Sequence, residues 1–268
     1  MSCVLLLSGC RSSDPEPPEE PPARTAPAEL PGEASEGARR VWSPPKWASP
    51  SQEAVEAFFA EACPGASLER RERRYRCVQG GRVVEAEVRT GHFVRKPEQE
   101  ALLAVRVSNA ASQESVSQLV LLRQVDATWR EVQRFDELGA GLGEVGFKAM
   151  LVGADERNRP VVCHQTCQEG CCEGACVLAR VMSERGELSL EVTPLVEIGR
   201  SGEATVEVKR ASFKDINADG ISDLILHRQT RAGGGEPQEE AVEFVFDGSA
   251  VKSRGAAAAG LPFRCGSR

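Results

Sequence analysis

The segment from residue 214 to residue 226, KDINADGISDLIL, carries oxygen-bearing side chains at a regular spacing. With Asp215 counted as position 1, Asn217 stands at position 3, Asp219 at position 5 and Asp223 at position 9. A ring of hard oxygen ligands suits Ca²⁺, which accepts about six to eight of them in a flexible geometry, whereas Mg²⁺ tends to keep its waters. The spacing therefore predicts a calcium site.

Gly220 permits the sharp turn that would bring the backbone carbonyl of Ile221 to the same centre. The stretch DINADGISDLIL resembles the calcium loops of FG-GAP/VCBS-type β-propeller repeats and, in its first half, those of EF-hands and dockerins. It departs from the EF-hand because Leu226 replaces the bidentate glutamate and a strand-like run follows. The resemblance implies a weak affinity, on the order of 0.1 to 1 mM, and the following ligands: Asp215, Asn217, Asp219, Ile221 and Asp223.

A second interpretation of this loop needs no ion. Asn, Asp and Gly often form tight turns in which side-chain oxygens accept backbone N–H groups. That interpretation leaves three aspartates close together with Lys214 as their one neighbouring cation in the sequence. Because like charges at short distance repel, the crowding favours a bound cation.

Eight cysteines after Cys10 form the second group of reactive side chains, and their even number fits an oxidising compartment. They are Cys63, Cys77, Cys163, Cys167, Cys171, Cys172, Cys176 and Cys265. Cys63 and Cys77 flank a helix exit and the first strand pattern, and are the first pair expected. The other six allow about 15 pairings, which stay open, except that a bond between adjacent Cys171 and Cys172 would strain the peptide.

The cluster CHQTCQEGCCEGAC at 163–176 could instead hold zinc or an iron–sulfur cluster. Zinc sites usually repeat a paired spacing such as C-x2-C, and this cluster does not. Outside the cytoplasm, thiols are also more often oxidised than bound to metal. A disulfide-linked loop is therefore expected here, with metal binding and a redox role as alternatives.

Other motifs carry little chemistry. The stretch GLGEVG at 141–146 fits G-x-G-x-x-G, but no acidic residue follows at the right place and strand patterns flank it, so a glycine-rich loop is expected. His92, His164 and His227 lie in no serine-hydrolase or zinc-protease motif. The basic run ERRERRYR at 69–76 is interleaved with glutamates and is interpreted as a solvated strand or turn, with a patch for an acidic partner as the alternative.

The elements that position these residues are mainly strands. One amphipathic helix is expected after a capping box of Ser49, Pro50 and Gln52, with Pro64-Gly65 ending it. Short β-branched runs then predict strands at 81–90, 101–109, 115–124, 127–135, 148–152, 160–164, 176–183, 187–193, 204–213, 222–228 and 241–246. The predicted fold is a compact antiparallel β domain preceded by one helix.

A faint internal repeat is present in this domain. Residues 153–165 and 216–228 both run from a polar turn into an apolar strand that contains a histidine, and a hairpin pattern follows each. Residues 99–109, with a hairpin at 116–135, fit an earlier copy. Blade-like units of this size belong to propellers, but three would not close a ring, so the domain is expected to be propeller-like or sandwich-like.

The chain before this domain looks like a membrane anchor and a spacer. Residues 1–9 are uncharged and apolar, and Leu7-Ser8-Gly9-Cys10 resembles the lipobox of bacterial lipoproteins. The resemblance implies a signal peptide at 1–9, whose true start is expected upstream, and lipidation of Cys10. Residues 10–48 are rich in Pro and Glu and predict a disordered linker. Residues 49–268 form the folded domain.

The formal net charge of -7 argues against a nucleic-acid partner, because such binding depends on clustered Lys and Arg. Arg11, which follows the lipobox cysteine in place of an aspartate, favours the outer membrane within this family. We therefore expect a lipid-anchored cell-envelope protein with a Ca²⁺-stabilised β domain and a binding or structural role without catalysis. A protein or glycan partner stays open, and the alternative is a hydrolase with an unrecognised carboxylate site.

Overall fold

The computed structural model describes residues 51–71, 74–94, 99–109, 111, 115–136, 138, 144–153, 155–254, 261 and 265. The described residues all belong to one compact unit, which falls within Arg40–Arg268. The predicted signal peptide, Cys10 and the linker at 10–48 lie outside the described residues. Within the described part, no helix is long and apolar enough to cross a membrane.

The domain is mainly β, as predicted. Its described elements are α1 (Gln52–Ala62), β1 (Glu69–Arg71), β2 (Arg74–Gln79), β3 (Arg82–Gly91), β4 (Glu100–Asn109), β5 (Ser115–Val125), β6 (Thr128–Phe135), β7 (Val145–Val152), β8 (Asn158–Gln168), β9 (Cys171–Glu184), β10 (Glu187–Ser201), β11 (Ala204–Lys214), β12 (Asp223–Arg231), β13 (Gln238–Phe246) and β14 (Val251–Ser253). The strands β1 to β6 form one antiparallel sheet in chain order, and β7 to β14 form a second.

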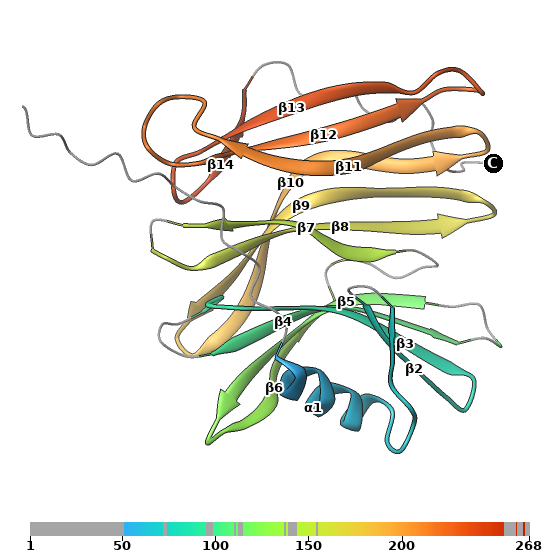
Figure 1. Ribbon diagram of the computed structural model, residues 1–268, viewed down its shortest axis with the longest axis vertical. Helices are drawn as coiled ribbons and strands as arrows, with labels where there is room; N and C mark the ends of the chain where they lie inside the picture. The colour runs from blue at the N-terminus through green and yellow to red at the C-terminus, as the bar shows by residue number, and fades with distance from the viewer. Residues whose placement is uncertain are drawn as a thin grey trace, which may run out of the picture. The chain divides into compact units, whose positions relative to one another are not determined.

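The second sheet consists of two halves. β9 and β10 pair along their whole length, but β10 and β11 pair only at Gly199–Ser201 with Ala204–Val206. The sheet therefore folds as two four-stranded meanders, β7–β10 and β11–β14, joined by a narrow hairpin. Figure 1 shows the first sheet, the middle meander and the last meander as successive layers.

This arrangement bears out the internal repeat. β3–β6, β7–β10 and β11–β14 are each four consecutive antiparallel strands. The three segments of the sequence repeat contain β4 and the first parts of β8 and β12, which are the second strands of the three meanders, and the predicted hairpins fall on the third and fourth strands. The three meanders do not close a ring, so the fold is a layered sandwich of blade-like units.

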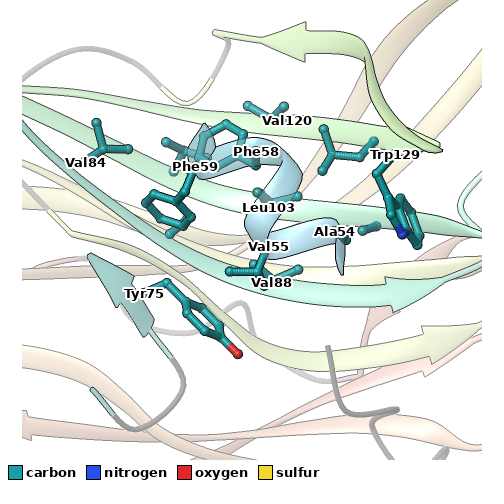
Figure 2. Packing of buried hydrophobic residues seen from close by; sticks show 14 of the residues in the cluster. Ala54, Val55, Phe58, Phe59, Tyr75, Val84, Val88, Leu103, Val120 and Trp129 are labelled. Atoms are coloured by element: carbon teal, nitrogen blue, oxygen red, sulfur yellow. The ribbon is translucent and has the colours of Figure 1, made fainter. Parts of the chain in front are cut away.

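The helix α1 covers the outer face of the first sheet. It begins at Gln52, directly after Ser51, whose Oγ accepts the N–H of Ala54 at 3.3 Å. The cap is therefore Ser51, and the expected cap at Ser49 is wrong by two residues. The predicted apolar face is correct, because Val55, Phe58 and Phe59 are buried against the sheet. Figure 2 shows Phe58 and Phe59 over the strand residues that they contact.

Two further apolar clusters hold the layers together. The inner face of the first sheet, for example Leu102 and Leu121, packs against Val162 and Val177 of the middle meander. The opposite face of the middle meander packs against the last one in a cluster with these buried members: Ala149, Leu151, Val161, Cys163, Cys176, Leu178, Val196, Ile198, Val208, Leu224, Leu226, Val242, Phe244 and Phe246. A strand with one face in each cluster alternates apolar side chains to both sides.

Most predicted strands exist, with bounds that shift by a few residues. The short strands β1, β2 and β14 were not predicted as separate elements, although residues 69–71 and 74–76 of the basic run lie in β1 and β2. The cysteine cluster at 163–176 is the main correction: it is not a loop but the β8–β9 hairpin, which turns at Glu169 and Gly170. Of the glycine-rich stretch at 141–146, Val145 and Gly146 belong to β7, and residues 141–143 lie outside the described residues.

Candidate functional site

The acidic loop predicted to bind calcium connects the first two strands of the last meander. β11 ends at Lys214 and β12 begins at Asp223, and these two residues face each other across the ladder. Ala218 and Gly220 have positive φ angles of 59° and 84°, and the glycine adopts that conformation without a Cβ clash. The loop therefore turns within its own residues and returns to the sheet.

Asp223 is a buried carboxylate at the end of this loop. It is 0% exposed. Its Oδ2 accepts the N–H of Ile216 at 2.7 Å, and its Oδ1 accepts the N–H of Phe246 at 2.8 Å. Asp223 therefore ties the start of the loop and the end of β13 to the first residue of β12.

The other three predicted side-chain ligands lie together on the exposed part of the loop. Asp215 accepts the N–H groups of Asp219 and Gly220 at 3.1 and 3.0 Å. Asn217 donates to Asp219 at 2.7 Å through Nδ2, and Asp219 accepts the N–H of Ile221 at 2.7 Å. These contacts are those of the tight turn that the second interpretation predicts.

The chemistry of these donors fits calcium in part. An ionised carboxylate has about four acceptor positions, so Asp215 and Asp219 keep free lone pairs after accepting these N–H groups. In the described residues, no ion pair joins Asp215 or Asp219 to Lys or Arg, and Arg254 instead donates to the carbonyl of Ile216 at 3.2 Å. The described part of the chain contains no group of three or more His, Cys, Asp or Glu side chains placed to share a metal. The structure thus brings Asp215, Asn217 and Asp219 into contact without converging them with Asp223.

A second buried carboxylate in the first meander corresponds to Asp223. Glu100 is the first residue of β4, as Asp223 is of β12, and it is also 0% exposed. Its Oε2 accepts the N–H groups of Phe93 and Val94, both at 2.7 Å, and its Oε1 accepts from Arg123 at 2.8 Å. Sequence reasoning missed this role; the signal was a polar residue opening the second strand of each repeat.

The cysteines form four disulfides. The expected pair Cys63–Cys77 joins the end of α1 to β2. The other three are Cys163–Cys176, Cys167–Cys172 and Cys171–Cys265, so the adjacent cysteines 171 and 172 are not joined to each other. Since all eight described cysteines are oxidised, none is a thiolate ligand for zinc or an iron–sulfur cluster. Four disulfides indicate an oxidising compartment outside the cytoplasm.

Three residues that no motif identified form a hydrogen-bonded chain on the last meander. Ser212 Oγ lies 3.0 Å from His227 Nε2, and His227 Nδ1 lies 3.3 Å from Glu239 Oε1. They come from β11, β12 and β13, and they lie on the face opposite to Leu224 and Leu226. With the proton on Nδ1, the order of hydroxyl, imidazole and carboxylate is that of a nucleophile, its base and the group that orients the base. Only the strand register brings these residues together, so sequence spacing could not reveal them.

A pocket of about 330 Å³ lies where the first strands of the three meanders meet, with Glu87 of β3, Phe147 of β7 and Glu207 of β11 in its wall. β7 is the last strand of its sheet, and among the described strands its outer edge has no partner. Arg74 donates to the carbonyl of Val145 at 3.3 Å, and Glu87 accepts the N–H of Phe147 at 3.0 Å. Glu87 therefore holds β7 against the first sheet and does not act as a free acid in this pocket.

His164 is a half-buried base in the same hairpin as the disulfides. It faces Val145 across β7 and β8, and its Nδ1 is buried without a hydrogen-bond partner in the described residues. Burial lowers the pKa of His164 below its ordinary value of 6.5, because the imidazolium form loses solvation. The ring is therefore neutral in the folded domain at neutral pH.

Comparison with known proteins gives no relative: no family model, no curated protein and no solved structure matches the chain.

Proposed function

We propose that this chain is a lipid-anchored protein of the outer membrane, whose β domain binds Ca²⁺ at residues 215–223 and serves in binding or structure without catalysis. The oxidised cysteines support an address outside the cytoplasm. The lipobox at Cys10 and the linker at 10–48 support a domain held at a distance from a membrane.

The calcium part of the proposal rests on one observation. Asp215, Asn217 and Asp219 contact one another on a single exposed loop, and in the described residues their charge is not neutralised by Lys or Arg. Ca²⁺ would supply that neutralisation and would stiffen the loop between β11 and β12. The backbone carbonyl of Ile221 is the fourth expected donor. Asp223 would hold the start of the loop in place through its hydrogen bond from the N–H of Ile216.

Thermal unfolding of the domain in CaCl₂ and in EGTA tests this proposal. A ligand at ten times its Kd stabilises the folded state by about 1.4 kcal/mol, which for a domain of this size raises Tm by about 3 to 6 °C. We expect this rise with Ca²⁺ and a smaller one with an equal concentration of Mg²⁺.

Asp219→Asn separates calcium from the tight turn. The amide oxygen still accepts the N–H of Ile221, so the backbone turn is retained; the exposed hydrogen bond from Asn217 and the charge that attracts the cation are lost. We expect the Tm in EGTA to stay within about 1 °C of wild type and the response to Ca²⁺ to disappear. Glu187→Ala removes an exposed carboxylate at the start of β10 and should leave the response intact. A wild-type Tm that is equal in CaCl₂ and EGTA would rule the ion site out.

The anchor is tested separately. In bacterial cells that process lipoproteins, a radiolabelled fatty acid should label the full chain and the protein should sediment with membranes. Cys10→Ala should abolish both, while the same substitution at Cys3 should abolish neither. Labelling that persists in Cys10→Ala contradicts the assignment of Cys10.

A hydrolase is the second candidate function, and the contacts of Ser212, His227 and Glu239 favour it specifically. A serine activated in this way reacts with fluorophosphonates. If the chain is a hydrolase, a fluorophosphonate probe labels Ser212, and both Ser212→Ala and His227→Gln lose the label. If the favoured proposal is right, the native protein is not labelled.

A further inference from the structure

Two disulfides occupy equivalent positions in one hairpin but have different surroundings. Cys163–Cys176 and Cys167–Cys172 each join residues that face each other directly across β8 and β9. Their backbone setting is therefore the same. Any difference in their reactivity must come from burial and from neighbouring side chains.

The Cys163–Cys176 disulfide is buried. Cys163 and Cys176 are 7% and 0% exposed and belong to the apolar cluster between the middle and last meanders. Gly146 of β7 pairs beside Cys163, and Val196 of β10 pairs beside Cys176. Cys176 is closed to an external thiolate, and Cys163 meets solvent only at the wall of the pocket beside β7, so attack on this disulfide should be slow.

The Cys167–Cys172 disulfide is accessible from one side. β7 begins at Val145 opposite His164, so among the described residues β8 has no partner on its β7 side beyond Gln165, and Cys167 is half-buried. Attack on a disulfide sulfur proceeds in line with the bond that breaks. The direction of approach to Cys167, opposite to Cys172, is therefore the side of β8 on which no described strand lies.

A cation lies next to the sulfur that would leave. Arg200 of β10 faces Cys172 across the ladder, and its Nη2 lies 3.9 Å from Cys172 Sγ. A guanidinium beside a thiol favours the thiolate, and a thiolate of lower basicity leaves a disulfide faster. Cys172 is 1% exposed, so this charge is only partly screened by water.

We propose that Cys167–Cys172 is a thiol-exchange site that accepts electrons from an external dithiol, a function beyond the calcium-binding role. The partner thiolate attacks Cys167 Sγ and forms a mixed disulfide, and the Cys167–Cys172 bond breaks with its electron pair going to Cys172. The second partner thiol then attacks the partner sulfur, releases Cys167 as a thiolate that takes up a proton, and leaves the partner as a disulfide. Two electrons pass from the partner to the protein.

Timed reduction of the native full chain tests this proposal. Dithiothreitol is added without denaturant, samples are quenched with N-ethylmaleimide, and each cysteine peptide is quantified by mass spectrometry. We expect Cys167 and Cys172 to be alkylated at least about tenfold faster than Cys163 and Cys176. The Cys63–Cys77 pair, which is 3% and 2% exposed, provides a second slow reference.

Substitution of Arg200 tests the role of its charge. Arg200 is exposed, so the fold should tolerate the change. Arg200→Gln should slow the alkylation of Cys167 and Cys172 by about threefold to tenfold, Arg200→Lys should restore most of the rate, and neither should change the rate at Cys163. Arg180→Gln removes another arginine of the same sheet and should change nothing.

Two results would overturn the proposal. One is alkylation of Cys167 and Cys172 at the rate of Cys163 and Cys176, which would mean that all of them react only through unfolding. The other is an Arg200→Gln protein with an unchanged rate at Cys172, which would remove the leaving-group argument.

Discussion

At the scale of single residues, buried carboxylates at the start of a strand replace the backbone partners that a turn cannot supply. Glu100 and Asp223 are both fully buried, and each accepts N–H groups from the segment that follows the preceding strand. A buried N–H without a partner costs about 1 to 3 kcal/mol. Such residues therefore fix where the second strand of a meander begins.

Asp223→Ala should consequently lower the free energy of unfolding by about 2 to 4 kcal/mol, because the N–H groups of Ile216 and Phe246 lose their acceptor. Urea denaturation in EGTA measures this without a contribution from calcium. Asp215→Asn, in the exposed part of the same loop, should cost less than about 1 kcal/mol. Equal losses for the two variants would contradict the structural role of Asp223.

His164 makes stability depend on pH. Because burial lowers its folded pKa below 6.5, the unfolded chain takes up a proton first as the pH falls. Its contribution to stability is complete above about pH 6.5 and is lost as the pH falls toward the lower folded pKa. In urea denaturation at a series of pH values, His164→Gln should show a smaller loss between pH 7.5 and 5 than wild type, and parallel curves would refute this assignment.

At the scale of elements, the disulfides should contribute in the order of the loops that they close. The sequence separations are 5 for Cys167–Cys172, 14 for Cys63–Cys77 and 94 for Cys171–Cys265. Loop entropy in the unfolded chain then predicts contributions of about 2, 3 and 4.7 kcal/mol. Urea denaturation of the three double Cys→Ala variants should reproduce this order, and a reversed order would show that native contacts outweigh chain entropy.

The elements themselves were largely predictable, and their partners were not. Alternating and continuous apolar runs predicted the strands and the buried face of α1, because burial on a sheet or helix imposes a period. The cluster at 163–176 was expected to be a loop, since its Cys, Gln, Glu and Gly residues lack the β-branched pattern; cross-strand disulfides supply the pairing there. The capping residue Ser51 was missed because Ser49 offered an equally good local signal.

For the candidate site too, contacts within one segment could be predicted from the sequence, and contacts between distant strands could not. The oxygen donors Asp215, Asn217 and Asp219 were placed on one loop by their spacing alone, and they do contact one another. The second role of Asp223, as acceptor for the N–H of Phe246, depends on β13, which is distant in sequence. The contacts of Ser212, His227 and Glu239 also depend on register across three strands, which no local pattern encodes.

At the scale of the whole molecule, the three layers share two apolar clusters and should unfold together. Phe246 is buried at the contact between the last two meanders, where the Arg159 guanidinium lies 5.4 Å from its ring centroid. Phe246→Ala should cost about 3 to 5 kcal/mol, and Val245→Ala, on the opposite face, less than about 1. Urea denaturation followed by tryptophan fluorescence and far-ultraviolet circular dichroism should give one coincident transition.

The bond from Cys171 to Cys265 closes a covalent ring that begins at the first residue of β9 and includes β10 and the whole last meander. The three-pair junction between β10 and β11 is then not the sole tether of this layer. If the apolar contacts of the last meander with the middle meander break, the last meander is still attached to β9 and β10 at two points. It can then dock again quickly. Without the Cys171–Cys265 disulfide, the undocked state of the last meander would last longer.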